Sequence, residues 1–449
     1  MPISQFREYF LGDVIFEQFE RAGENNAGLT VYGVDSKVGI TSESKYQSKK
    51  IHNYKILRNG MFAYNPMRLN IGSIGYCHAE LREGLVSPDY VVFGCDIEKL
   101  DPEYLYFFIK SDFWNTWVEG AGVGSVRVRI YFRELINIPI RLPSIKYQKK
   151  IVSILKSFDN KIKLNRQTNQ TLEQIAQAIF KSWFVDFEPV KAKMAAKQAG
   201  ASAEQIEHAA LCAISGKTPE QLAQLDPQTL QQLKATAVLF PDALVDSEMG
   251  EIPEEWEASK LGKHFNVVMG QSPSGDTYNE VGDGIVFFQG RRDFGFRFPT
   301  ARVYTTDPKR FAQAGDTLIS VRAPVGDKNM ACEKCCLGRG VASIRHKSGS
   351  RSFTYAFISY IESNLSNSGS DGTVFSSINK DELNAVSYVA PSDVLVTHFE
   401  ELIHPIDEQV EVLSKEIDSL EKTRDFLIPK LLSGELLIES SQSCSEQVL

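Results

Sequence analysis

Basic and amide side chains gather at the ends of several short apolar runs in this chain. In the densest example, Gln289-Gly290-Arg291-Arg292 directly follows the apolar run Ile285–Phe288. Such side chains read base edges in the major groove of DNA, and a good bidentate pair contributes about 1–3 kcal/mol of discrimination. For any one of them, the alternative is an ordinary exposed side chain. The candidates for DNA contact are Lys45, Lys49, Asn65, Arg68, Arg127, Arg129, Gln289, Arg291, Arg292, Arg322, Arg339 and Thr373.

Two short motifs resemble parts of catalytic sites but lack residues that those sites need. Gly216-Lys217-Thr218 resembles the end of a phosphate-binding loop, yet Leu211 stands where the first glycine of that loop belongs. Asn65-Pro66-Met67 begins like the loop of an amino-methyltransferase, yet Met67 replaces its second proline. We therefore predict no catalytic residue in this chain.

A cysteine cluster invites comparison with a zinc site. Cys332, Cys335 and Cys336 lie close together, and His346 follows ten residues after the last of them. A structural zinc site usually needs two well-spaced ligand pairs, and only one cluster is present. We predict buried, reduced cysteines in or beside a strand, and no metal site.

The candidate DNA contacts need elements that position them, and the strongest pattern is that of two long helices. From residue 151 to residue 179, apolar side chains recur at alternating steps of four and three, which is the seam of a coiled coil. The same phase returns 248 residues later. The predicted seam residues are Ile151, Leu155, Phe158, Ile162, Leu172, Ile179, Phe399, Ile406, Val410, Leu413, Ile417, Leu420 and Leu427.

Four residues depart from the pattern of an ideal coiled coil. Asn165 and Asn169 occupy seam positions, where asparagine lowers stability but fixes the register. Pro405 predicts a kink in the second helix or a delayed start. Arg424 at a seam position is expected to extend to solvent or to pair with an acid.

A second repeat lies outside the helices. Pro391-Ser392 follows Pro143-Ser144 by 248 residues, and Leu261-Gly262 follows Leu11-Gly12 by 250. We predict an α+β chain in which two similar strand-rich α/β domains are separated by two long antiparallel coiled-coil helices, with an internal pseudo-two-fold repeat of about 248 residues. The predicted segments are domain 1–143, helix 144–184, a helical linker 185–250 with little core of its own, domain 251–391, helix 392–433 and tail 434–449.

The net charge of -8 is unevenly distributed. Residues 144–184 carry eight basic and two acidic residues, whereas residues 392–449 carry four basic and 13 acidic ones. Opposite charge favours pairing of the two helices with each other, although each could instead present an ordinary solvated face. Both strand-rich domains are close to neutral. We therefore expect weak DNA binding by the isolated chain, with partner proteins supplying positive charge.

The sequence also favours a cytoplasmic location. It contains an odd number of cysteines, seven, and no apolar run near the length of about 20 residues that crosses a bilayer. The first residues lack the pattern of a signal peptide.

The predicted arrangement suits two kinds of protein. About 36 residues of helix span ~55 Å, and symmetric DNA readers place two modules a turn of ~34–36 Å, or a multiple of it, apart. The helices would then set the gap between two DNA readers. The alternative is a coiled-coil scaffold protein with two protein-binding heads. A fused methyltransferase is a weaker third hypothesis.

The chain resembles the specificity subunits (HsdS) of type I restriction–modification systems over nearly its whole length. The resemblance is carried by Leu142–Ile151 between the first domain and its helix, by Phe184–Val190 after that helix, and by Gly250–Trp256 at the start of the second domain. The second hinge, Pro391–Val396, lacks the glutamine that the first hinge has at Gln148. The segment 199–236 is longer than the usual linker.

The resemblance implies a non-catalytic subunit whose two target-recognition domains each read one half of a bipartite DNA target. It implies partners as well: two methyltransferase (modification) subunits that grip the helices, and motor-nuclease (restriction) subunits that cleave. This chain would hold no cofactor. S-adenosylmethionine, ATP and Mg are expected in the partner subunits, where adenine would be methylated.

Overall fold

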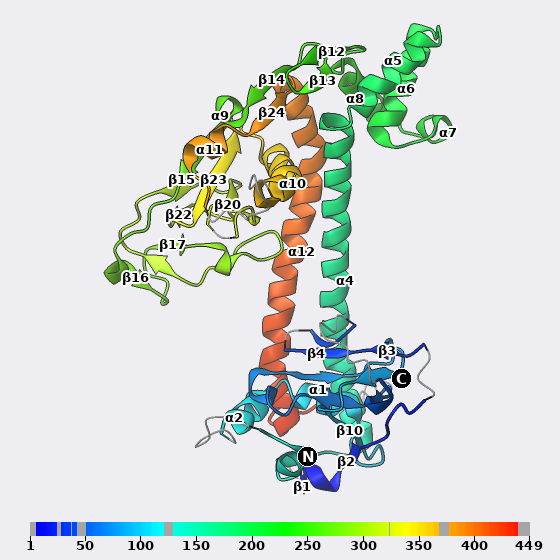
Figure 1. Cartoon of the computed structure of the whole chain (residues 1–449), viewed down its shortest axis with the longest axis vertical. Coiled ribbons are helices and arrows are strands. Elements are labelled where there is room, and N and C mark those ends of the chain that lie inside the picture. Colours follow the sequence, from blue (N-terminus) through cyan, green and yellow to red (C-terminus); the bar gives the residue numbers. More distant parts are fainter. Residues whose placement is uncertain are drawn as a thin grey trace, which may run out of the picture. The chain divides into compact units, whose positions relative to one another are not determined.

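The computed structural model describes residues 6–24, 28–36, 38–42, 51–120, 129–322, 324–367 and 377–438. It comprises two compact units, the first formed by Met1–Leu164 with Ile417–Leu449 and the second by Asn165–Glu416. Helices and short strands occur together in both, so the chain is an α+β protein (Figure 1). The division passes through both long helices, and each unit therefore holds strands together with parts of both.

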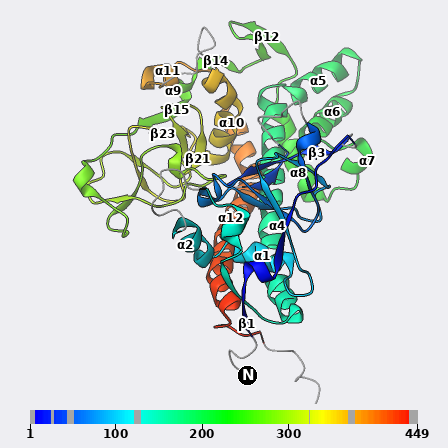
Figure 2. The same ribbon diagram turned by 60° about the horizontal axis from the view of Figure 1, so that its bottom comes forward.

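The long helices are α4 (Ile145–Phe184) and α12 (Asp393–Ser433). In the second unit, Asn165 Nδ2 donates to Glu416 Oε2 (2.9 Å) and Asn169 Nδ2 donates to Ser414 Oγ (3.2 Å). Numbers rise along α4 as they fall along α12, so these segments are antiparallel. Figure 2 shows the two helices side by side from a second direction.

The seam side chains differ in burial. Ile151, Leu155, Ile162, Phe399, Val410 and Leu413 are buried, whereas Phe158, Leu172, Ile179, Ile406, Ile417, Leu420 and Leu427 are half-buried. Arg424 pairs with an acid, as predicted: its Nη1 lies 2.6 Å from Asp159 Oδ1, within the first unit. The predicted delay at Pro405 is wrong, because α12 starts at Asp393 and its helical backbone continues through the proline. Pro405, which has no backbone N–H, is preceded by twelve helical residues.

The first unit is built on a four-stranded antiparallel sheet in the order β2-β10-β7-β8, beside the pair β1–β11. These strands are β1 (Arg7–Phe10), β2 (Ile15–Gln18), β7 (Phe62–Tyr64), β8 (Ile74–Tyr76), β10 (Val91–Cys95) and β11 (Pro139–Leu142). Smaller sheets join β3 (Thr30–Val31), β9 (Gly84–Val86) and β6 (Lys55–Leu57), and β4 (Gly33–Asp35) with β5 (Gly39–Thr41). The helices are α1 (Pro102–Phe108), α2 (Asp112–Gly120) and α3 (Phe132–Leu135), with 3-10 turns at Leu11–Asp13, Ile51–Asn53 and Leu69–Ile71.

The second unit has the same inner topology, with the sheet β15-β23-β20-β21 and the pair β14–β24. These strands are β14 (Glu257–Lys260), β15 (Phe265–Met269), β20 (Thr317–Ser320), β21 (Lys328–Met330), β23 (Val341–His346) and β24 (Ser387–Ala390). Its outer sheet differs and joins β16 (Tyr278–Asn279), β18 (Tyr304–Thr305), β17 (Ile285–Phe288), β22 (Cys335–Leu337) and β19 (Phe311–Ala312). The helices are α9 (Leu261–His264), α10 (Arg351–Asn367) and α11 (Lys380–Asn384), with 3-10 turns at Gly275–Thr277 and Arg291–Asp293.

In each unit, a glycine near the start of the strand-rich domain packs against a residue near the end of that domain. A Cβ on Gly12 would lie 2.8 Å from Ile136 Cβ, and one on Gly262 would lie 2.7 Å from Asn384 Cβ. Beside them, Leu11 N donates to Ile138 O (2.9 Å) and Leu261 N donates to Val386 O (2.8 Å). The start of each strand-rich domain therefore packs against its end in the same way, which explains the repeated Leu-Gly pair.

The segment 185–250 is largely helical, as predicted. Its helices are α5 (Glu188–Gln198), α6 (Ala203–Ser215), α7 (Pro219–Leu222) and α8 (Pro227–Val238), followed by the hairpin of β12 (Leu244–Ser247) and β13 (Gly250–Pro253). Val190, Leu211 and Phe240 of this segment are buried, and they belong to the main apolar cluster that the segment shares with the rest of the second unit. None of the helices in the described ranges is long and apolar enough to cross a membrane.

Candidate nucleic-acid interface

Three predicted contact residues come together at the end of β7 in the first unit. Asn65 Oδ1 accepts a hydrogen bond from Met67 N (3.0 Å), and Asn65 O accepts one from Arg68 N (2.9 Å), which closes a tight turn. Ile130 N donates to Pro66 O (3.0 Å) and so brings Arg129 beside this turn. Asn65 is half-buried, whereas Arg68 and Arg129 are exposed. We call Asn65, Arg68 and Arg129 the first surface.

The equivalent place in the second unit is built by the same backbone contact. Ile378 N donates to Val321 O (3.0 Å), just beyond the end of β20, and the exposed Arg322 follows. Arg322 and Arg339 both line a pocket of about 580 Å³ at this place. The acidic side chain in its lining is Glu382, so positive charge predominates there.

Gln289 is brought to the same edge through the turn between β22 and β23. Val321 N donates to Gly340 O (2.9 Å), and a Cβ on Gly340 would lie 2.6 Å from Gln289 O. A Cβ at residue 340 would collide with this backbone oxygen, which favours glycine there. We call Gln289, Arg322 and Arg339 the second surface.

Arg291 and Arg292, which follow Gln289, behave differently from each other. Arg291 Nη1 lies 2.5 Å from Asp327 Oδ2, so this guanidinium is already paired. Arg292 is exposed, and we find no hydrogen bond or ion pair joining it to a described residue. Arg292 is therefore the better placed of the two to meet a DNA phosphate or base. The predicted contacts Lys45, Lys49, Arg127 and Thr373 lie outside the described residues.

A buried arginine that was not among the predicted contacts lies a few residues further on. Arg297 is only 3% exposed, and its guanidinium pairs with Glu173 of α4 and with Asp407 of α12. Its Cζ lies 3.5 Å from the ring centroid of Tyr355 on α10. Burial alone would lower the pKa of Arg297, but the ring and the carboxylates outweigh burial and raise it. The available sequence signal was an arginine flanked by phenylalanines, Phe296-Arg297-Phe298.

Two of the three cysteines lie as predicted, buried in a strand, whereas the prediction of burial is wrong for Cys332. Cys335 and Cys336 are buried neighbours on β22, and Cys332 is exposed. Burial raises the pKa of Cys335 to about 12, which favours the protonated thiol. Within the described ranges, no three His, Cys, Asp or Glu residues are grouped closely enough to hold a metal ion.

Gln148 lies in the first hinge, Leu142–Ile151, and its side-chain amide forms hydrogen bonds within the first unit. Its Nε2 donates to Lys99 O (2.8 Å) and to Pro143 O (2.9 Å), and its Oε1 accepts from Asp101 N (2.9 Å). Because the residue is completely buried, it is a structural tie rather than a surface for another protein. The corresponding residue of the second hinge is the buried Val396.

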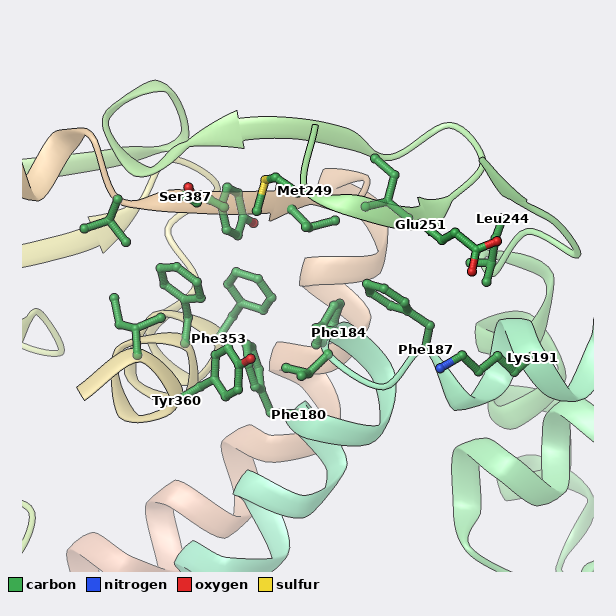
Figure 3. Close-up of a pocket in the computed structure, with 17 residues that line it drawn as sticks. Phe180, Phe184, Phe187, Lys191, Leu244, Met249, Glu251, Phe353, Tyr360 and Ser387 are labelled. Carbon is green, nitrogen blue, oxygen red and sulfur yellow. The ribbon is translucent and has the colours of Figure 1, made fainter. Parts of the chain in front are cut away.

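A pocket of about 640 Å³ lies at the C-terminal end of α4 in the second unit. Figure 3 shows Phe180, Phe184, Phe353 and Tyr360 gathered there between α4 and α10. Its charged lining residues are Lys191 and Glu251. The lining shares no residue with either surface and is mainly apolar, so we assign it no role in DNA contact.

Comparisons with known proteins agree on one family. A family model described as "Type I restriction modification DNA specificity domain" matches residues 46–174. The HindI type I restriction enzyme specificity subunit of Haemophilus influenzae is 29% identical, over 97% of this chain and 100% of that protein. The MjaIX specificity subunit of Methanocaldococcus jannaschii is 22% identical, over 75% of this chain and 69% of that protein.

A solved structure has a similar fold. The type I restriction–modification S subunit from M. genitalium aligns with 95% of this chain and 96% of its own, at 13% identity and a TM-score of 0.52. At this identity the likeness concerns the fold alone.

Proposed function

The chain belongs to the family of type I restriction–modification specificity subunits, and we propose that it supplies the DNA sequence specificity of such a complex. Members of this family are non-catalytic. The observation that carries the proposal is the match to a specificity subunit along the full length of both proteins, 97% of this chain and 100% of the relative. The chain therefore acts by positioning other subunits on a chosen DNA sequence.

Each unit reads one half of a bipartite DNA target. The first surface and the second surface support this assignment, because both lie where a strand of the inner sheet ends. The matching bonds from Ile130 N to Pro66 O and from Ile378 N to Val321 O hold them in the same way. Arginine, asparagine and glutamine at these edges supply donors for guanine and adenine. The chain is then a duplicated arrangement of a recognition domain and a helix.

The paired helices set the gap between the two half-sites. The 40 residues of α4, at a rise of about 1.5 Å each, span roughly 60 Å, which lies between one and two turns of B-DNA. The buried Asn165 and Asn169 support a fixed register, because each forms a hydrogen bond with a defined partner on α12. A slip along the seam would break both hydrogen bonds.

The helices also dock two methyltransferase subunits. Apolar side chains outside the seam support this role, because Leu164 and Ile175 on α4, and Leu402 and Val412 on α12, are exposed. Burial of these side chains by a partner would remove apolar surface from water, which favours association. Those subunits bind S-adenosylmethionine and methylate adenine, and motor-nuclease subunits use ATP and Mg. The complex works in the cytoplasm, where genomic DNA is accessible to it.

Mapping of adenine methylation across the genome tests the proposal. Cells that contain the partner subunits are compared with and without this chain. We expect a split motif, with two specific parts and a constant gap, that disappears when the chain is deleted. An unchanged methylation map would contradict the proposed function. A scaffold protein with two protein-binding heads would leave the map unchanged.

A further inference from the structure

The loop between β17 and β18 links the second surface to both long helices. It begins at Gln289, which belongs to the second surface, and passes through Arg292. Eight residues after Gln289 it reaches Arg297, whose guanidinium lies between Glu173 of α4 and Asp407 of α12. One short loop therefore carries candidate DNA contacts at one end and a contact to both helices at the other.

The backbone around Arg297 is held as firmly as its side chain. Asn329 is completely buried, and its amide group both accepts from Gly295 N (3.0 Å) and donates to Gly295 O (3.0 Å). Met330 N donates to Arg297 O (2.8 Å). These bonds tie the loop to β21 of the inner sheet. A shift of the helices against Arg297 would therefore move the inner sheet as well.

The charges of this cluster are poorly explained by stability. A buried ion pair often contributes no more than well-packed apolar residues of the same volume, because the desolvation of the charges is costly. Arg297 Nε and Asp407 Oδ2 are buried and have no hydrogen-bond partner in the described part of the chain. The cluster does fix the orientation of the Arg297 guanidinium relative to both helices. The planar guanidinium fork meets one acid on each helix and lies over the Tyr355 ring, so these three contacts together restrict its orientation.

We propose that Arg297 is a positioning residue that fixes the angle of the second recognition domain on the helix pair, and thereby the register in which the second half-site is read. The inference rests on the proposed function. Domain rotation about the helices would change the number of base pairs between the half-sites. By holding both helices at once, Arg297 allows a single gap.

The ion pairs between α4 and the domain of the first unit are more exposed than that of Arg297. Lys163 Nζ lies 2.8 Å from Glu80 Oε2, but these side chains are 57% and 78% exposed. Lys156 pairs with Glu103 at 2.6 Å, also at the surface. Exposed ion pairs constrain geometry little because solvent and salt compete with them. The inference therefore concerns the second half-site alone.

The test is the methylation map of cells whose complex contains the Arg297→Lys chain. Lysine keeps the positive charge but cannot meet both acids in a fork. We expect methylation at the normal site to persist. At sites whose gap differs by one base pair it should rise about tenfold over wild type, the change that accompanies a loss of 1.4 kcal/mol in discrimination. The bases of both half-sites should stay the same.

Arg302→Lys is the matched control. Arg302 belongs to the same loop and pairs with Asp293 (3.0 Å), and no contact of its side chain with α4 or α12 is found among the described residues. This variant should keep the single gap. Asp407→Asn is the second test variant, because it weakens only the contact to α12 and should also admit altered gaps.

Three results would overturn the inference. A proportional loss of methylation at all sites, with the gap unchanged in both Arg297→Lys and Asp407→Asn, would mean that the cluster only stabilises the fold. Equal relaxation in Arg302→Lys would mean that the loop, rather than Arg297, sets the gap. A wild-type map without a split motif would overturn the proposed function and this inference together. The first two results would overturn the inference alone, so the two failures can be distinguished.

Discussion

The two units share an inner sheet but fasten it to the long helices differently. In the first unit, Gln148 of α4 bonds to backbone groups of Lys99, Asp101 and Pro143. In the second, the corresponding Val396 is apolar, and Glu400, one turn later on α12, accepts from Ser350 Oγ (2.5 Å) and Ser352 N (2.8 Å). These hydrogen bonds reach the start of α1 in the first unit and the start of α10 in the second. The two units therefore join the long helix to the domain at the same place but with different side chains.

The difference extends to charge. The second unit adds the buried Arg297 between Glu173 and Asp407, whereas Lys156 and Lys163 of α4 form more exposed ion pairs with the domain of the first unit. A shared framework thus leaves each domain free to evolve its own attachment to the helices. The loops that carry the attachment in the second unit also carry its candidate DNA contacts.

Loss of the buried cation should produce the largest effect. Arg297→Met leaves two carboxylates without their partner and should destabilise the second unit by about 3–5 kcal/mol. Lys163→Met in the first unit removes only an exposed pair and should cost less than about 1 kcal/mol. Amide hydrogen exchange of the full chain measures both, since it reports the opening free energy of each unit separately. Equal losses would show that the two attachments do not differ as described.

Acid should weaken the second unit through His346. Burial lowers the pKa of this histidine to about 4, whereas the unfolded chain binds a proton near pH 6.5. Between those values the unfolded state holds more protons, so the stability contributed by neutral His346 is complete above about pH 6.5. It should be lost as the pH falls to about 4, up to about 3 kcal/mol.

His346→Gln is the variant that sharpens this contrast, because glutamine does not titrate. Amide exchange of β23 and α10, followed from pH 7 to pH 4, should show a smaller loss of protection in the variant than in wild type. His78→Gln in the first unit is the matched control and should leave the second unit unaffected. An equally steep acid dependence with and without His346 would assign the effect to other groups.

Periodic features were predictable from the sequence, and contacts over long distances were not. The a/d pattern placed α4 and α12 within a residue of their observed ends, because an apolar period sustained over 40 residues has few alternatives. The segment 185–250 was predicted as a helical linker, but its Ala-Lys composition did not reveal how the α5 helix packs. Its packing depends on Phe180 and Trp183 of α4 and on the other helices of the segment.

The candidate site shows the same limit. Strand ends with basic side chains could be recognised locally, and the structure gathers Asn65, Arg68 and Arg129 into one surface. The pairing of Arg291 with Asp327 could not be read from the sequence. Nor could the role of Arg297, whose acidic partners are 124 and 110 residues away along the chain. In a loop rich in glycine and phenylalanine, nothing local distinguishes a buried arginine from an exposed one.

The central claim is that each unit reads its own half of the target, and substitution of one surface at a time tests it most directly. The methylated motif is mapped for the complex with Asn65→Ala, Arg68→Ala and Arg129→Ala together, and separately with Gln289→Ala, Arg322→Ala and Arg339→Ala. We predict that each set relaxes base preference in one half only, by about 1–3 kcal/mol of discrimination per lost base contact, and leaves the other half and the gap unchanged. Relaxation of both halves by either set, or of neither half by both sets, would contradict the account.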